Sequence, residues 1–139
     1  MPRSSKKRLL IPAVSPAAPG PLYRQIVEGV KREIIEGRLD GGQPLPSFRT
    51  LAENLLVSLI TVKRAYEELE HEGIIYRKQG LGTFVSQQGA ARSRRAKRAE
   101  AERLMRRAVR EAAQGGMDPS DVVDLARRLM REAKGERRK

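Results

Sequence analysis

The sequence has no cysteine and no tryptophan, and its one histidine is His71. Without cysteine there are no disulfides and no thiolate zinc site, and one histidine cannot form the usual structural zinc sites. No apolar run approaches the roughly 20 residues of a membrane span. A nucleophile elbow, a P-loop and a metal-binding histidine pair are also absent. We therefore expect a soluble cytoplasmic protein that is not an enzyme, with no cofactor, no metal and no membrane partner.

Positive charge is what the chain has in excess. Its 139 residues include 29 Lys and Arg against 17 Asp and Glu, a net charge of +12. Residues 1–20 hold four basic residues and no acidic one, residues 21–89 hold nine of each, and residues 90–139 hold sixteen basic and eight acidic residues. Such an excess indicates a polyanionic partner, with solubility alone as the alternative. We expect the flanks to supply long-range attraction and the neutral body to supply docking geometry.

Two short helices joined by a tight turn are predicted in the middle of the chain. Apolar residues recur at intervals of three and four in residues 48–55 and again in residues 62–69, the spacing of one helix face. Ser47 and Ser58 precede these stretches and suit the capping of the first N–H groups. The Leu-Leu-Val sequence at 55–57 is too short and too apolar for a loose loop, so we expect a packed turn. The pattern predicts a helix-turn-helix.

A β-hairpin is predicted directly after Gly73, the glycine that ends the second of these helices. Two short β-rich runs, Ile74–Lys78 and Thr83–Ser86, flank a glycine-rich tip at residues 79–82. A hairpin in this position is a wing. The fold class is therefore mainly α with a small β-hairpin, a winged helix-turn-helix domain assigned to residues 21–87, followed by a two-helix region.

A further helix is predicted ahead of the helix-turn-helix. Apolar residues from Tyr23 to Ile34 recur at helical spacing, Pro21 suits the first turn, and Gly37 suits the end. We expect this helix to pack against the next two. Residues 1–20, rich in proline and basic residues, are predicted to be a disordered basic arm. A minor-groove role for the arm and a plain flexible lead-in both stay open.

Two more helices are predicted after a short linker at residues 88–91. The helical pattern covers residues 92–134 and is interrupted by Gly-Gly at 115–116. The Asp-Pro-Ser-Asp sequence at 118–121 is a strong helix start, because proline suits the first helical position and acids suit the first turn. Residues 135–139 are predicted to be a frayed basic tail.

The apolar stripes of these two helices are too small to be stable when paired only with each other. We predict that they form a homodimer interface with a second copy, and packing against the chain's own winged domain is the alternative. The predicted interface residues are Leu104, Met105, Ala108, Val109, Val122, Ala126, Leu129 and Met130. Because two-fold dimers read two half-sites, the predicted partner is double-stranded DNA with a near-palindromic operator.

Four segments follow one another over residues 21–86, and their order and spacing carry a resemblance: PLYRQIVEGVKREIIEGRL, LPSFRTLA, VSLITVKRAYEELEHEGII and YRKQGLGTFV. In these segments the chain resembles the GntR family of bacterial transcription regulators. Its short C-terminus, with GGMDPSDVVDLARRLM, resembles the YtrA subfamily, whose members lack a large effector domain. The resemblance implies a dimeric, sequence-specific repressor of its own or a neighbouring operon, with a transporter operon as one candidate.

The resemblance also implies roles for single residues. Arg49 matches an arginine that contacts DNA from the helix before the turn, and Ser58 and Thr61 match hydroxyls expected near phosphates. Lys63 matches a basic position that reaches DNA from the second helix, and the wing-tip pair Gln79-Gly80 matches a minor-groove contact. The complete predicted DNA-binding set is Arg49, Ser58, Leu59, Ile60, Thr61, Lys63, Arg64, Gln79, Gly80 and Gly82.

Two positions depart from the common pattern of the family, which has arginine at Leu59 and glutamate at Phe48. A recognition helix reads bases with its N-terminal turns, and an apolar side chain there can recognise a thymine methyl group. We therefore expect Leu59 to favour thymine where related proteins favour guanine. For Ile60, a DNA contact and a core position are equally open. At Gly80 and Gly82, close approach to DNA and turn geometry alone both explain glycine.

Five basic residues between 92 and 98 begin the long helix just after the wing. They either reach phosphates beside the half-site or form a solvated helix face. Two other function classes remain alternatives to the specific regulator. One is an architectural DNA-binding protein of low specificity, which the basic flanks favour, and the other is a winged-helix protein-interaction module.

Overall fold

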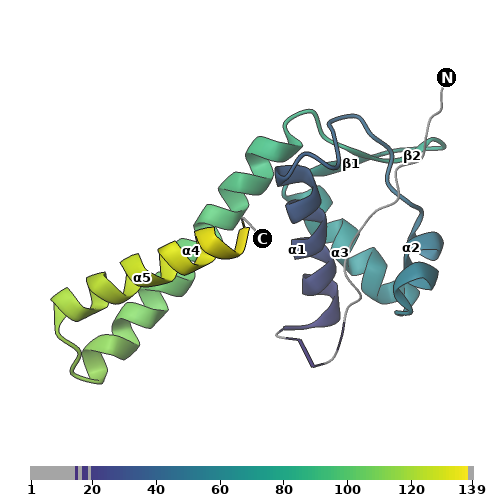
Figure 1. Cartoon of the computed structure of the whole chain (residues 1–139). Helices are drawn as coiled ribbons and strands as arrows, with labels where there is room; N and C mark the ends of the chain where they lie inside the picture. The colour runs from purple at the N-terminus through teal and green to yellow at the C-terminus, as the bar shows by residue number, and fades with distance from the viewer. Residues whose placement is uncertain (1–14, 16, 19, 138–139) are drawn as a thin grey trace. The chain divides into compact units, whose positions relative to one another are not determined.

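The structure, a computed structural model, describes residues 15, 17–18 and 20–137, so the predicted basic arm lies mostly outside the described residues. Figure 1 shows the helices and the hairpin in chain order. The elements are α1 (Leu22–Ile35), α2 (Phe48–Leu55), α3 (Leu59–His71), β1 (Ile75–Lys78), β2 (Gly82–Val85), α4 (Gly89–Gln114) and α5 (Pro119–Arg137). The chain divides into two compact units, the first ending at Lys97 and the second beginning at Arg98.

The first helix, α1, forms where it was predicted and packs its apolar face against α3. Ile26, Val27 and Val30 on this face are fully buried. Pro21 has an extended backbone and is the N-cap, so it lies just outside the first turn instead of in it. At the other end Gly37 has φ +81°, a left-handed conformation that glycine adopts at little cost, and this residue ends the helix as predicted.

Both predicted serine caps are confirmed. The Ser47 hydroxyl accepts a hydrogen bond from the Thr50 N–H at 3.1 Å, and the Ser58 hydroxyl accepts one from the Thr61 N–H at 3.1 Å. Each cap satisfies one N–H group that the helix itself leaves without a partner. The caps therefore fix where α2 and α3 begin, and with them the orientation of the recognition helix.

The turn between α2 and α3 is less packed than the sequence suggests. Leu55 and Val57 lie against the core, but Leu56 is 90% exposed and has a left-handed backbone, φ 58° and ψ 46°. The expectation of a packed turn is therefore wrong at Leu56. The chain must reverse within one residue here, and for a non-glycine residue this conformation costs about 1–2 kcal/mol.

The wing forms close to its predicted position. β1 and β2 are antiparallel, with Ile75 opposite Val85 and Lys78 opposite Gly82. Ile74 was predicted as the first strand residue and lies outside β1, because its N–H donates to the Leu69 carbonyl at the end of α3. The loop before α2 lines the other edge of β2 through an isolated bridge between Pro44 and Phe84. β2 is thus held on both sides.

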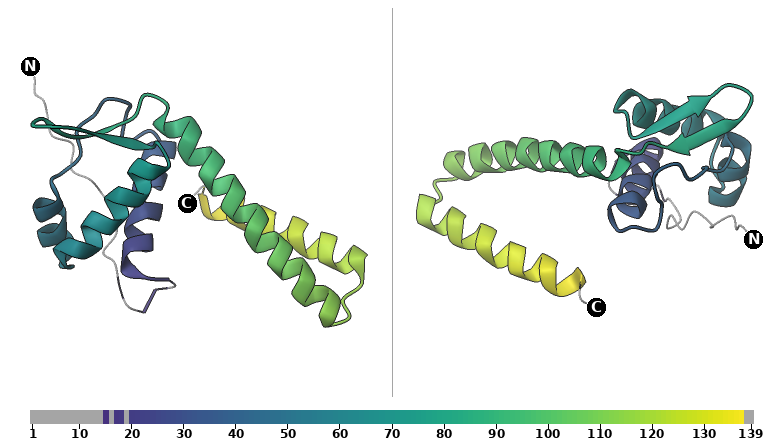
Figure 2. Two further views of the ribbon diagram at one scale, coloured as in Figure 1. Left: turned by 180° about the vertical axis from the view of Figure 1, so that it is seen from behind. Right: turned by 90° about the horizontal axis from the view of Figure 1, so that it is seen from above.

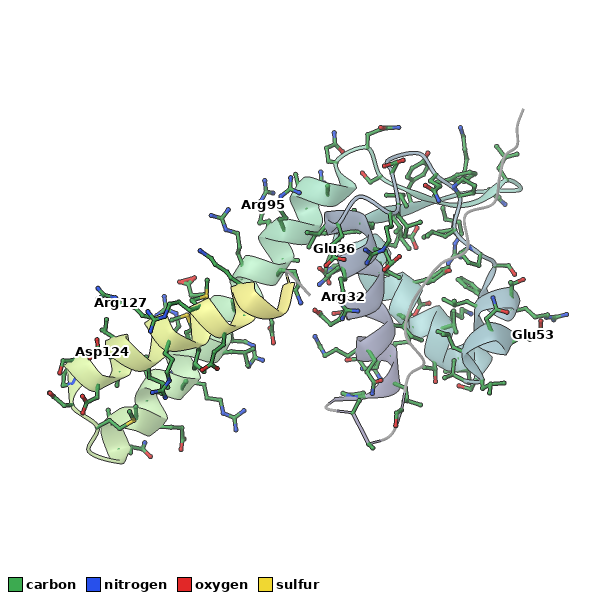
Figure 3. All side chains as sticks on the ribbon, viewed as in Figure 1. Arg32, Glu36, Glu53, Arg95, Asp124 and Arg127 are labelled. Atoms are coloured by element: carbon green, nitrogen blue, oxygen red, sulfur yellow. The ribbon has the colours of Figure 1, made fainter. Side chains whose placement is uncertain are left out.

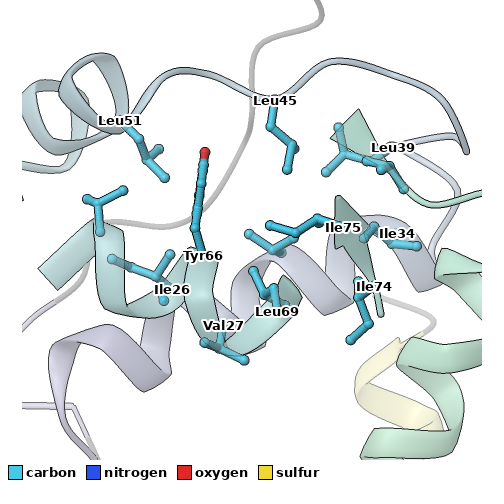
Figure 4. Packing of buried hydrophobic residues seen from close by; sticks show 14 of the residues in the cluster. Ile26, Val27, Ile34, Leu39, Leu45, Leu51, Tyr66, Leu69, Ile74 and Ile75 are labelled. Carbon is cyan, nitrogen blue, oxygen red and sulfur yellow. The ribbon is translucent and has the colours of Figure 1, made fainter. Parts of the chain in front are cut away.

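One core joins α1, α2, α3 and the hairpin, and Figure 4 shows its side chains meeting around Tyr66. The Tyr66 ring is almost fully buried, and its hydroxyl donates to the Pro46 carbonyl at 2.8 Å. Burial raises the pKa of this hydroxyl well above its usual range. Tyr66 therefore remains a donor and ties α3 to the segment that leads into α2. Phe84 of β2 is half-buried.

A chain of ion pairs joins α1 to its neighbours. The Lys31 ammonium is almost fully buried and lies 3.0 Å from the carboxylate of Glu72, the C-cap of α3. Glu28 lies 3.8 Å from the same ammonium and accepts a hydrogen bond from Lys97 of α4 at 2.6 Å. Removing one partner of a buried pair leaves a charge without compensation. Lys31 is therefore a structural residue and not part of a binding surface.

The predicted linker at 88–91 differs from the structure, because α4 already begins at Gly89. The first turns of α4 belong to the winged domain: Ala90 packs against its core and Ser93 is fully buried. A Cβ at Gly89 would lie 2.9 Å from the Val85 side chain, so this close approach requires glycine. The sequence signal for a linker was composition alone, and composition does not show which small residues are packing contacts.

The second unit consists of the remaining part of α4 and of α5. Gly116, with φ +75°, lies just after the end of α4, and Pro119 is the first residue of α5, as predicted. From this connection the two helices diverge (Figure 2). Polar side chains such as Asp124 and Arg127 point outward from α5 (Figure 3). The predicted frayed tail at 135–139 is wrong through Arg137, because α5 continues to that residue.

None of the predicted interface residues in the second unit is buried. Leu104, Met105, Val109, Leu129 and Met130 are each about half exposed. Ala108 is exposed, and Val122 and Ala126 are half-buried. The stripes therefore form at the predicted positions, and within one chain they remain accessible.

Candidate nucleic-acid interface

The exposed face of α3 carries most of the predicted DNA-binding side chains. Leu59 is 47% exposed and Ile60 is 78% exposed, whereas Val62 and the other core positions of this helix are fully buried. Ile60 therefore lies opposite the core, and the core alternative for it is wrong. Lys63 and Arg64 are exposed one turn further along. The first turns of α3 thus present two aliphatic and two cationic side chains together.

The cap of α3 places two hydroxyls at the start of this face. Besides accepting from the Thr61 N–H, the Ser58 hydroxyl lies 2.7 Å from the Thr61 hydroxyl, and either one is able to donate to the other. Only one of the two hydroxyl protons is used in this pair. The other is free to donate to an anion, which is what a contact between the helix start and a phosphate requires.

Arg64 is held by an aromatic ring that sequence reasoning did not connect with it. Its guanidinium carbon lies 3.9 Å from the ring centroid of Tyr23, on α1. Stacking on an aromatic face positions an arginine without neutralising its charge. Tyr23 was assigned only to the apolar stripe of α1, and its half-burial beside an exposed helix is the structural signal that the sequence lacks.

Two of the predicted cations are exposed and without an ion pair among the described residues. They are Arg49, in the first turn of α2, and Lys63, on α3. By contrast, the cations Lys31, Arg38 and Lys97 are paired with carboxylates at 3.0 Å or less. Arg49 and Lys63 therefore keep their charge available for DNA.

The wing tip is exposed as predicted, and its glycines are explained by backbone geometry. Gly80 has φ +78° and Gly82 has φ +117°, and a Cβ at either position would meet no atom within 4 Å. Turn geometry alone therefore requires glycine here. Gln79 is exposed beside them. Leu81, which the predicted set omitted, is 67% exposed at the same tip.

A groove of about 430 Å³ separates the start of α2 from the wing. Its lining residues are Leu45, Ser47, Phe48, Arg77, Lys78, Gln79, Gly80, Gly82 and Thr83. Two exposed cations of β1, Arg77 and Lys78, line this groove and were not in the predicted set. The basic pair next to a glycine-rich tip was the sequence signal for them.

The described residues hold no group of three or more histidine, cysteine, aspartate or glutamate side chains arranged to bind a metal. Across the same part of the chain, none of the helices is long and apolar enough to span a membrane. The titratable groups of the exposed α3 face are separate lysine, arginine, glutamate and histidine side chains, and they form no cluster of nucleophile and base.

A capped recognition helix, an exposed face of aliphatic and cationic side chains, and a wing beside it define a winged helix-turn-helix DNA-binding transcription regulator. The chain belongs to the GntR family. The sequence profile of "Bacterial regulatory proteins, gntR family" matches residues 22–85, which cover the whole winged domain up to the end of β2. Proteins of this family are regulators and not enzymes, which agrees with the expectation from sequence.

Relatives match the chain in two different ways. The HTH-type transcriptional repressor NagR of Bacillus subtilis is 44% identical over 73 residues, 52% of this chain, and the match spans only 30% of NagR. The HTH-type transcriptional repressor YtrA of the same organism is 28% identical over 122 residues, 88% of this chain and 94% of YtrA. NagR therefore matches about half of this chain, whereas YtrA matches over most of the length of both chains.

A solved structure extends the similarity to the fold. A GntR family transcriptional regulator from Listeria monocytogenes matches with a TM-score of 0.65 and 30% sequence identity. The match covers 79% of this chain and 96% of the Listeria protein. The similarity therefore includes helices beyond the winged domain.

Proposed function

We propose that this chain is a cytoplasmic, homodimeric repressor that binds a near-palindromic operator and blocks transcription of its own or a neighbouring operon. The observation that carries the proposal is the exposed face of α3, where Leu59, Ile60 and Lys63 lie together in the first turns after the Ser58 cap. The relatives NagR and YtrA are both named repressors, which supports repression over activation.

The DNA contacts that we propose are of two kinds, those that position the protein on the DNA backbone and those that read the base sequence. Ser58 and Thr61 are suited to phosphates because they offer hydroxyl protons, and Arg49 and Arg64 add positive charge beside them, so we assign these four residues to the DNA backbone. The wing tip at 79–82 is suited to the minor groove. Leu59 and Ile60 are suited to the major groove, where an apolar side chain recognises the methyl group of thymine.

The homodimer is supported by the exposed stripes of the second unit. Leu104, Met105, Leu129 and Met130 expose apolar surface at helical spacing, and a second copy would supply a matching surface. A two-fold dimer presents two recognition helices related by symmetry, so the operator would have half-sites about one helical turn apart, or offset modestly from that spacing.

A binding selection from random duplexes tests the reading of bases. The wild-type chain should select a motif with thymine at the position that faces Leu59. Leu59→Arg should shift that position to guanine by about 1–3 kcal/mol of discrimination, because arginine pairs with the guanine edge. Identical motifs from both proteins would show that Leu59 does not face the bases.

A low-specificity architectural protein is the second candidate, favoured by the basic residues on both sides of a neutral winged domain. Competition in a gel shift separates the two candidates. A specific regulator releases its operator only to matching competitor, whereas an architectural protein releases it equally to any duplex. Absence of binding to any duplex at low salt would instead favour a protein-interaction module.

A further inference from the structure

We propose that the groove between the start of α2 and the wing seats one phosphodiester of the DNA backbone, that Arg77 and Lys78 contact it, and that Phe48 positions Arg77 for this contact. The inference rests on the proposed DNA binding and adds to it a site whose two cations lie outside both the recognition helix and the wing tip. The ligand class is a phosphodiester anion, recognised by charge and not by base sequence.

The location of the groove follows from the shape of a DNA duplex. A sugar-phosphate strand separates the major groove from the adjacent minor groove. A protein that places a helix in one and a wing in the other must therefore let this strand pass between them. The groove lies on that route, since its walls are the start of α2, which carries Arg49, and the wing from Arg77 to Thr83. Its volume of about 430 Å³ leaves space for a backbone segment.

Arg77 is fixed in place by a series of ring contacts. Its guanidinium carbon lies 5.1 Å from the ring centroid of Phe48, within the range of a cation–π contact. The Phe48 ring in turn packs edge-to-face on Tyr66, with centroids 5.2 Å apart. Tyr66 is buried and hydrogen-bonded to Pro46. The rings of Phe48 and Tyr66 therefore connect Arg77 of the wing to the buried face of α3.

The same contacts show which side of α3 the groove adjoins. Tyr66 touches Phe48, and Glu70 lies 4.0 Å from Arg77. Residues 59, 63, 66 and 70 are separated by three or four positions and so share one flank of α3. That flank includes Leu59 and Lys63, two of the side chains proposed to meet DNA. The groove thus borders the proposed reading face.

Phe48 holds Arg77 without removing its charge. A carboxylate at position 48, as in the glutamate that many family members have, would pair with Arg77 and neutralise it before DNA arrives. The carboxylate actually nearby, Glu70, stands at 4.0 Å with both side chains more than 40% exposed, so their attraction is weak. An aromatic ring orders the guanidinium and leaves all its N–H donors for a phosphate.

The other lining residues suit an anion that approaches closely. Lys78 is exposed and adds a second charge. Gly80 and Gly82 carry no side chain, and the remaining lining includes Leu45, Phe48 and Thr83. Two cations beside one groove attract a phosphate through their charge, and salt weakens this attraction because the cations are exposed.

Binding isotherms at several salt concentrations test the contact, with the full-length chain on its operator and on a duplex of arbitrary sequence. Arg77→Gln should lower affinity for both duplexes by a similar factor, about tenfold, and flatten the salt dependence by about 0.9 unit of slope. Arg32→Gln, an exposed arginine on α1 outside the groove, is the matched control and should leave the slope unchanged. An unchanged slope for Arg77→Gln would overturn the phosphate contact.

The positioning role of Phe48 is tested by combining variants. Phe48→Leu should weaken duplex binding roughly twofold to fivefold in the wild-type background and not at all beside Arg77→Gln. Phe48→Tyr keeps a ring and should restore wild-type affinity. Equal losses of duplex affinity in both backgrounds would show that Phe48 only packs against the core, and would overturn its role in positioning Arg77. If the wild-type chain bound neither duplex at low salt, the proposed function itself would fail, an outcome distinct from the loss of this site alone.

Discussion

The two compact units use their apolar side chains in opposite ways. In the first unit Ile26, Leu69 and Val85 are fully buried in one core. In the second, every large apolar side chain of α5 is at least partly exposed. Every buried residue that the structure describes lies at or before Ser93. The first unit therefore buries its apolar side chains in a core of its own, whereas the second unit leaves its apolar side chains exposed.

Removing the second unit should have the largest effect. A chain ending after Lys97 keeps the whole core and should fold as a monomer. Its operator affinity should fall by about 10²–10⁴, because two linked recognition helices bind far more tightly than one. Sedimentation and binding isotherms measure both quantities.

A chain ending at residue 88 is the informative comparison. It also loses the contacts of Ala90, Ser93 and Lys97 with the winged domain. It should therefore melt at a lower temperature than the chain that ends after Lys97. If the shortest chain still formed dimers as strong as those of the full chain, the C-terminal helices would not be the interface.

A pair of glycine substitutions sharpens the contrast between the units. Gly89→Ala places a Cβ 2.9 Å from the Val85 side chain and 3.3 Å from the Ile74 carbonyl oxygen. Crowding of this kind should destabilise the chain by about 1–3 kcal/mol. Gly135→Ala in α5 meets no atom within 4 Å and should gain up to about 1 kcal/mol from helix propensity. Denaturant unfolding of both variants checks the signs, and equal effects would contradict the packing of α4.

The basic residues at the start of α4 should have an intermediate effect. Lys97 is paired with Glu28, and the Arg92 side chain lies against Gly73, so both have structural partners. Arg94, Arg95 and Arg98 are exposed, and Arg95 points away from α4 in Figure 3. Neutralising these three should flatten the salt dependence by about two units and leave specificity unchanged. A slope equal to that of the wild type would make them a solvated helix face.

Leu56→Gly should give the smallest change, and a favourable one. Glycine removes the left-handed strain and increases the freedom of the unfolded chain, so the net gain is about 0.5–1 kcal/mol. Leu55→Gly, one residue earlier in the regular part of α2, should instead destabilise. Thermal melting compares the two. A loss of duplex affinity in Leu56→Gly at unchanged stability would identify the exposed leucine as a DNA contact.

Local rules predicted most of the winged domain. The caps at Ser47 and Ser58, the ends at Gly37 and Gly73 and the buried stripe of α3 all depend on residues close together in sequence, and all are confirmed. The errors occurred where contacts between residues far apart in the sequence determine the structure. Gly89 resembled a linker residue because its approach to Ile74 and Ile34, which lie far away in the sequence, cannot be identified from spacing. The proposed groove was missed for the same reason, since Phe48 and Arg77 lie far apart in the chain and meet only in the fold.

The burial of Ser93 has a consequence for how domains of such regulators recombine during evolution. A recombination that joined a winged domain to a new C-terminal module at the apparent linker would cut between the domain and the turns of α4 that complete it. A junction after Lys97 would transfer the ion pair with Glu28 and the close approach at Gly89 together with the winged domain. Hybrids with the junction after Lys97 should contain a complete winged domain. We therefore expect the start of α4 and the winged domain to recombine as one evolutionary unit.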